Sequence, residues 1–63
     1  MTEEEARPFI GKWCLILWQA HGTLAGMTGK VVGVEDDWVV VDYGYGAYLP
    51  IVVSIKEIES NAE

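Results

Sequence analysis

The chain has 63 residues, which is the length of one small domain. Its single cysteine excludes a disulfide within the chain, and with one histidine besides we expect no metal site. Ten acidic against four basic residues give a net charge of −6, which excludes the basic stripe of a typical duplex-binding protein. Hydrophobic residues make up 51% of the chain, more than so small a core can bury, so we expect exposed apolar surface that marks a partner interface.

Residues 1–9 predict a short N-terminal helix. Thr2 and Glu5 have the spacing of a capping box, and Pro8 limits the helix to one or two turns. The acidic start of the chain predicts no secretion signal, and the longest apolar run, 13–18, is too short to cross a membrane. We therefore expect a cytoplasmic domain that does not enter a membrane.

The apolar run 13–18 predicts the first strand. It has no polar alternation, so we expect both of its faces to be covered, the inner by the core and the outer by the N-terminal helix or another subunit. Residues 21–29 are punctuated by glycine and predict a loop. The second strand follows at 30–34, where Gly33 predicts a bulge or a strong bend.

The rest of the chain predicts three more short strands, at 38–43, 47–49 and 51–54. In the first of these, Val39, Val41 and Tyr43 share one face, and Trp38, Val40 and Asp42 share the other. A glycine loop at 44–46 joins it to the next strand. A closing helical turn around Ile55 and Ile58 and a frayed polar tail at 60–63 complete the chain.

Short strands at this spacing predict an all-β fold. In a chain of this length we expect a five-stranded, strongly bent SH3-like barrel after the short helix, with residues 1–63 as its single domain.

The segment Gly29-Lys30-Val31-Val32-Gly33-Val34-Glu35-Asp36 resembles the second strand of the Sm/LSm family, and 53–58 is similar to that family's closing strand. The resemblance covers residues 3 to 59. It implies an Sm-like barrel that forms a homo-oligomeric ring through strands four and five and, as in many members, binds single-stranded RNA. Trp38 stands where the family usually has a base-contacting asparagine. Leu49-Pro50 replaces the family's basic residue and glycine before the last strand.

A second resemblance is to the KOW motif of ribosomal and transcription-elongation proteins. Gly22, Gly26, Gly29 and Val31 have the spacing of that motif, over about a third of the chain. KOW segments usually carry basic residues in this loop, whereas the first basic residue here is Lys30. Both families have a small barrel, and the sequence leaves open whether the glycine segment is of the KOW or the Sm type.

Aromatic residues around the third and fourth strands predict a binding surface. Exposed rings can stack on unpaired bases, or they can form a protein interface, which the negative net charge favours. The candidate nucleic-acid-binding residues are Asp37, Trp38, Tyr45, Tyr48 and Lys30.

The fourth and fifth strands have few charged residues to prevent edge pairing. We therefore expect copies of the chain to join edge to edge, with closed symmetry satisfying all edges. The candidate interface residues are Ala47, Tyr48, Leu49, Ile51, Val52 and Val53.

No residue pattern indicates catalysis. Cys14 lies within an apolar strand and is expected to be inert, and His21 is expected to be a solvated turn residue. We predict that the protein is not an enzyme and needs no cofactor. Two functions remain: an Sm-like homo-oligomer that binds single-stranded RNA or DNA and acts in nucleic-acid processing, or a protein-interaction or scaffold module without nucleic-acid binding.

Overall fold

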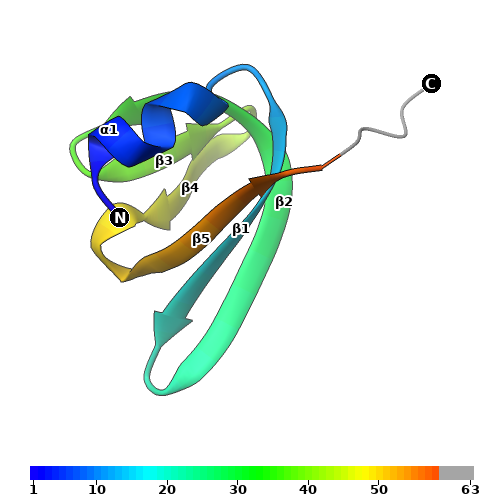
Figure 1. The fold of residues 1–63 in the computed structure, drawn as a ribbon. Coiled ribbons are helices and arrows are strands. Elements are labelled where there is room, and N and C mark those ends of the chain that lie inside the picture. Colours follow the sequence, from blue (N-terminus) through cyan, green and yellow to red (C-terminus); the bar gives the residue numbers. More distant parts are fainter. Residues whose placement is uncertain (59–63) are drawn as a thin grey trace.

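The computed structural model describes residues 1–58 and shows a mostly-β domain (Figure 1). A short helix, α1 (Glu3–Ala6), continues into the 3-10 turn η1 (Arg7–Phe9). A second 3-10 turn, η2 (Leu49–Ile51), precedes the last strand. The strands are β1 (Trp13–Ala20), β2 (Thr23–Glu35), β3 (Trp38–Val41), β4 (Gly44–Tyr48) and β5 (Val52–Glu57).

The strands form one antiparallel sheet in the order β4-β3-β2-β1-β5. The mostly-β, five-stranded fold with an N-terminal helix is confirmed, but the strongly bent barrel is wrong, because the sheet is neither closed nor strongly curled. Closure of a sheet requires its two edge strands to pair. Here η2 carries the chain from β4 to β5 without pairing the two strands.

The predicted glycine loop is mostly strand. β2 begins at Thr23, and its first eight residues pair with β1 from Ala20↔Thr23 to Trp13↔Lys30. Two glycines of this segment, Gly26 and Gly29, do not form a turn; side chains of neighbouring residues lie close to their backbone. A Cβ at Gly26 would lie 2.6 Å from Leu17 Cδ2, and one at Gly29 would lie 3.3 Å from the Tyr43 hydroxyl.

The bulge predicted beside Gly33 is confirmed. The pairing of β2 with β3 runs from Val31↔Val41 to Gly33↔Val40, so Val32 is the extra residue. Up to Lys30, β2 pairs with β1, and from Val31 onward it pairs with β3. The bulge therefore joins the two halves of the sheet.

Several boundaries differ from the predicted ones. β3 ends at Val41 and β4 begins at Gly44, so Tyr45 lies in a strand rather than at a loop tip. β5 runs to Glu57, so the closing helical turn predicted at 55–58 is wrong. The β5 backbone forms strand hydrogen bonds with β1. This pairing outweighs the helical spacing of Ile55 and Ile58 on which the prediction was based. The tail predicted at 60–63 lies outside the described residues.

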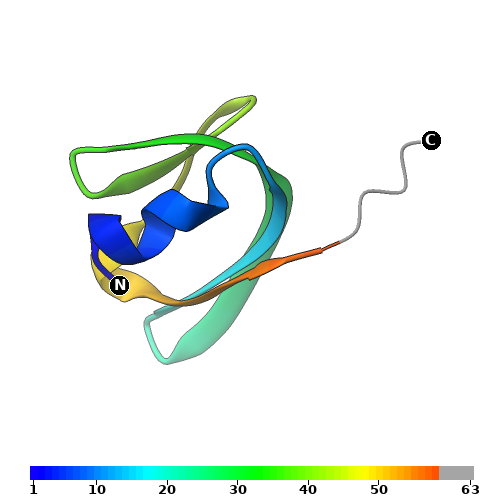
Figure 2. The ribbon, with the colours of Figure 1, turned by 45° about the horizontal axis from the view of Figure 1, so that its top comes forward.

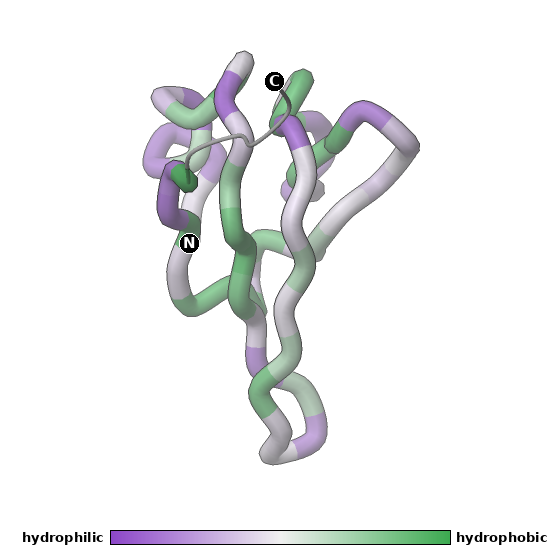
Figure 3. The backbone as a smooth tube through the Cα atoms, turned by 90° about the vertical axis from the view of Figure 1, so that its right-hand side faces the viewer, coloured by the Kyte–Doolittle hydropathy of each residue, from purple (hydrophilic) through white to green (hydrophobic). Residues whose placement is uncertain are grey.

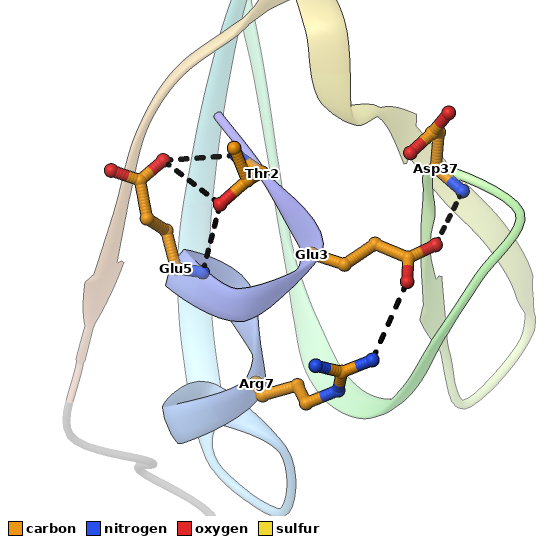
Figure 4. A network of polar contacts seen from close by, with 5 residues as sticks. All are labelled: Thr2, Glu3, Glu5, Arg7 and Asp37. Carbon is orange, nitrogen blue, oxygen red and sulfur yellow. Dashed lines mark hydrogen bonds and ion pairs between the residues drawn. The ribbon is translucent and has the colours of Figure 1, made fainter.

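The predicted N-terminal helix and its cap are confirmed. The Glu5 N–H donates to Thr2 Oγ1 at 3.2 Å, and the Thr2 N–H donates to Glu5 Oε1 at 2.9 Å (Figure 4). The helix lies on the side of the sheet toward which the strands bend (Figure 2), and Ala6 is fully buried there.

The core lies between this helix and the inner face of the sheet. Ten hydrophobic residues are buried in it: Ala6, Cys14, Ile16, Val31, Val39, Val41, Ala47, Leu49, Val52 and Ile55. Along β1, Cys14 and Ile16 point inward, so Trp13, Leu15 and Leu17 point to the outer face. The helix packs on the inner side, so it does not cover that outer face, contrary to one of the two alternatives predicted.

Candidate functional site

Three of the predicted binding residues form one cluster on the outer face of β3 and β4. Trp38 and Tyr48 are opposite each other in the β3–β4 pairing, with ring centroids 5.3 Å apart. Tyr45 meets Trp38 edge to face, at a centroid distance of 5.8 Å and an interplanar angle of 64°. Trp38, Tyr45 and Tyr48 are called the aromatic cluster below.

The aromatic cluster is a surface feature. Val39 and Val41 occupy the inner face of β3, so the alternation of a strand turns Trp38 outward. Tyr45 is 65% exposed, Tyr48 41% and Trp38 37%. The rings are therefore available to a ligand or a partner.

A hollow of about 390 Å³ opens on this surface, lined by Asp36, Trp38 and Tyr45. Small-ligand pockets span roughly 300–1,000 Å³, so the hollow suits one side chain or a small group. Its rim is acidic, because Glu35, Asp36 and Asp37 follow one another at the turn between β2 and β3. The chemistry of the hollow is thus aromatic and anionic.

The acidic turn is held in place by distant parts of the chain. The Asp37 N–H donates to Glu3 Oε2 at 2.8 Å, and the Asp37 carbonyl accepts from the Leu49 N–H at 2.7 Å. Glu3 also meets Arg7, at 3.5 Å between Oε1 and Nη2 (Figure 4). Asp37 therefore has a structural role through its backbone. Sequence reasoning missed Glu3, whose partner lies 34 residues away.

Lys30 does not join the aromatic cluster. It is opposite Trp13 in the β1–β2 pairing and five residues before Glu35, roughly 16 Å away along the strand. Lys56 is opposite Leu15 in the β1–β5 pairing. Both lysines therefore border the β1 outer face, the name used below for Trp13, Leu15 and Leu17.

The candidate interface residues divide into two groups. The side chains of Ala47, Leu49 and Val52 are 3%, 0% and 5% exposed. These side chains are part of the chain's own core, so only the backbone of these residues remains for a partner, and their assignment to an interface stays a prediction. The other three candidates are exposed and lie beside the strand edges: Tyr48, Ile51 and Val53.

Cys14 and His21 lie in different surroundings. Cys14 is fully buried, and its thiol donates to the Lys12 carbonyl at 3.5 Å. Burial raises the pKa of the Cys14 thiol, the Glu57 carboxylate raises it further, and Lys12 lowers it. His21 is exposed in the turn between β1 and β2. Among residues 1–58 no three ligating side chains gather as a metal site would require.

Comparisons with protein-family models, with curated proteins and with solved structures found no match for this chain. The Sm/LSm and KOW resemblances thus stay at the level of short motifs, and no family is assigned. In the part of the chain that the structure describes, no helix has the length and hydropathy needed to span a membrane.

Proposed function

We propose that the protein is an interaction module that assembles with copies of itself by pairing the β4 edge of one copy with the β5 edge of the next. The strand order carries this proposal, because it leaves β4 and β5 as two unpaired edges within residues 1–58. An exposed edge presents unpaired N–H and C=O groups to any added strand. Because the two edges differ, the contact is head to tail and builds a ring or an open chain.

The residues beside the edges support the same arrangement. β4 contains no charged residue that would prevent strand addition. Tyr48 at its end, Ile51 in η2 and Val53 in β5 are 41%, 36% and 53% exposed. Burial of these apolar side chains against another copy would stabilise the assembly by the hydrophobic effect.

The test compares two valines of similar exposure. Val53 lies on the edge strand β5 and is 53% exposed, whereas Val32 lies in the central strand β2 and is 49% exposed. Sedimentation velocity across the micromolar range should show an oligomer for the wild type and for Val32→Lys, and a folded monomer for Val53→Lys. A wild type that stays monomeric at every concentration would refute the proposal.

Val52 is unsuitable for this test. Its side chain is only 5% exposed, so a charge there would be buried without a partner and would unfold the chain. Loss of assembly in such a variant would therefore say nothing about the edge.

A second candidate function is single-stranded RNA or DNA binding by an Sm-like ring. The exposed aromatic cluster favours it, since each base stacked on an aromatic ring contributes about 1–3 kcal/mol. The adjacent acidic turn opposes it, because phosphates would meet carboxylates. Fluorescence anisotropy with labelled oligonucleotides at low salt tests this function, and Trp38→Ala should weaken any binding without changing the assembly. Absence of binding would eliminate it.

A further inference from the structure

Two regions on the outer side of the sheet differ in charge, one acidic and one basic. The aromatic cluster borders the acidic turn at Asp36, whereas the β1 outer face is bordered by Lys30 and Lys56. Among residues 1–58 the other two bases form ion pairs within the chain, Arg7 with Glu3 and Lys12 with Glu57. Lys30 and Lys56 form none there, so the structure presents two lysines on one surface and an anionic aromatic hollow on another.

We infer that the hollow lined by Asp36, Trp38 and Tyr45 receives Lys56 from a second copy of the chain when the β4 and β5 edges pair. This inference rests on the proposed function. It adds a specific contact that sets which part of β5 lies beside β4.

Pairing of two copies can bring Lys56 of one copy and the hollow of the other to the same side of the joined sheet. Lys56 is opposite Leu15, which points outward because its neighbours in β1 are buried, so Lys56 also points outward. Tyr45 points outward from β4 with the rest of the aromatic cluster. A strand added to an edge continues the sheet, and residues opposite each other then point to the same side. Within the sheet β4 and β5 run in the same direction, so a copy that adds its β5 parallel to β4 keeps its outer face on the same side. Its Lys56 then lies on the surface that carries the hollow.

The reach of a lysine side chain fits this distance. Neighbouring strands lie about 4.8 Å apart, so Lys56 of the added strand would be one strand from Tyr45 and two strands from Trp38. Its four-carbon stem can lie across the Tyr45 ring while the ammonium extends toward Trp38 and Asp36.

The chemistry of the hollow selects a cation. An ammonium is attracted to the face of an aromatic ring within about 6 Å of the ring centroid. The Trp38 and Tyr45 rings touch edge to face, so an ammonium in the hollow beside them can lie within that distance of both rings. The Asp36 carboxylate adds an opposite charge at the same place. A carboxylate from the partner would be repelled there.

Lys30 is the matched control. It carries the same charge and borders the same β1 outer face, but it lies on β2, two strands from the β5 edge. It cannot reach the hollow of a copy that pairs through β5. The β1 outer face as a whole would likewise stay outside this contact.

The experiment measures the assembly constant of four variants by sedimentation equilibrium, with circular dichroism to verify that each is folded. Lys56→Glu should weaken assembly about tenfold or more, because it replaces attraction by repulsion in the hollow. Asp36→Asn should weaken it less, and asparagine also tolerates the left-handed backbone at this position (φ 53°). Lys30→Glu should assemble like the wild type, and Asp36→Lys combined with Lys56→Glu should recover part of the loss.

The outcomes separate this inference from the proposed function. If Lys56→Glu assembles normally, or if Lys30→Glu weakens assembly equally, the lysine contact is refuted. Edge pairing would still stand if Val53→Lys dissociates the same assembly. Loss of oligonucleotide binding in Lys56→Glu without loss of assembly would also refute the lysine contact. A wild type that is monomeric throughout would overturn both proposals.

Discussion

Two turns with the same backbone conformation are stabilised in different ways. His21 and Gly22 join β1 to β2 with φ of 55° and 75°, and Asp36 and Asp37 join β2 to β3 with φ of 53° and 67°. Both are two-residue hairpin turns in the left-handed region. The first lies at the far end of the β1–β2 hairpin, away from the helix (Figure 3). The second lies beside the helix and the hollow.

The difference shows two origins for one conformation. Gly22 accepts positive φ without steric cost, so local preference is sufficient in the first turn. The second turn has no glycine, and its Asp37 is held by two hydrogen bonds, one that its N–H donates to Glu3 and one that its carbonyl accepts from Leu49. Tertiary contacts thus fix the turn that lines the candidate site, whereas the other turn depends on its own residues.

The largest change in the free energy of unfolding should come from Leu49, whose backbone N–H donates to the Asp37 carbonyl and whose side chain lies in the core. Leu49 is fully buried, so Leu49→Ala should lower the free energy of unfolding by about 2–5 kcal/mol. Leu24, next to the first turn, is 57% exposed, and Leu24→Ala should cost about 0.5 kcal/mol or less. Urea unfolding measures both. Similar losses in the two variants would contradict the difference between a buried and an exposed leucine side chain.

A smaller effect is expected from the first turn itself. Gly22→Ala places a side chain at φ 75°, where nothing lies within 4 Å of the new Cβ, so the cost is that of the backbone, about 1–2 kcal/mol. Asp37→Gly in the second turn should change the free energy of unfolding by less than about 0.5 kcal/mol, because relief of left-handed strain offsets added freedom of the unfolded chain. Thermal melts measure both variants. A large gain for Asp37→Gly would mean that its anchoring contacts carry strain.

The contact between helix and turn should have an effect near 1 kcal/mol. Glu3→Ala removes the acceptor for the Asp37 N–H and should lower the free energy of unfolding by about 0.5–1.5 kcal/mol. Glu4→Ala removes an equal charge from the same helical turn and controls for the helix dipole. Amide hydrogen exchange at Asp37 should accelerate only in the Glu3 variant. Equal exchange in both variants would contradict the anchoring role of Glu3.

The smallest change in the free energy of unfolding should appear at alkaline pH and come from Cys14 in β1, which belongs to neither turn. The folded state holds the pKa of the Cys14 thiol above its ordinary value through burial and Glu57. The unfolded chain therefore loses this proton first, and stability falls as pH rises through the ordinary pKa of a thiol. Urea unfolding at neutral and alkaline pH should show this decrease in the wild type and a smaller one in Cys14→Ala. An identical decrease in both would assign it to other groups.

The features that the sequence predicts well are those with local causes. The helix follows from Thr2 and Glu5, three residues apart, and the bulge follows from Gly33. The glycine segment of β2 was predicted as a loop because glycine usually marks turns. Gly26 and Gly29 are instead approached closely by the side chains of Leu17 and Tyr43, and no local pattern reveals such neighbours.

Closure of the sheet and the full composition of the site were not predictable in the same way. Whether β4 and β5 pair depends on the direction in which η2 leads the chain from one strand to the other, and no single local motif sets that direction. The aromatic cluster could be predicted because its three residues belong to one hairpin. Lys30 was predicted to bind nucleic acid together with the aromatic residues, although β2 carries it to a different surface.

The long strand β2 has a mechanical consequence for any assembly. It pairs with β1 up to Lys30 and with β3 from Val31 onward, so both halves of the sheet share its backbone. Both halves also contribute side chains to one core, so the domain should melt in a single cooperative transition. A load applied by a neighbour at β4 would pass through β3, β2 and β1 to the neighbour at β5, so adjacent joints in the assembly would be stiffly linked.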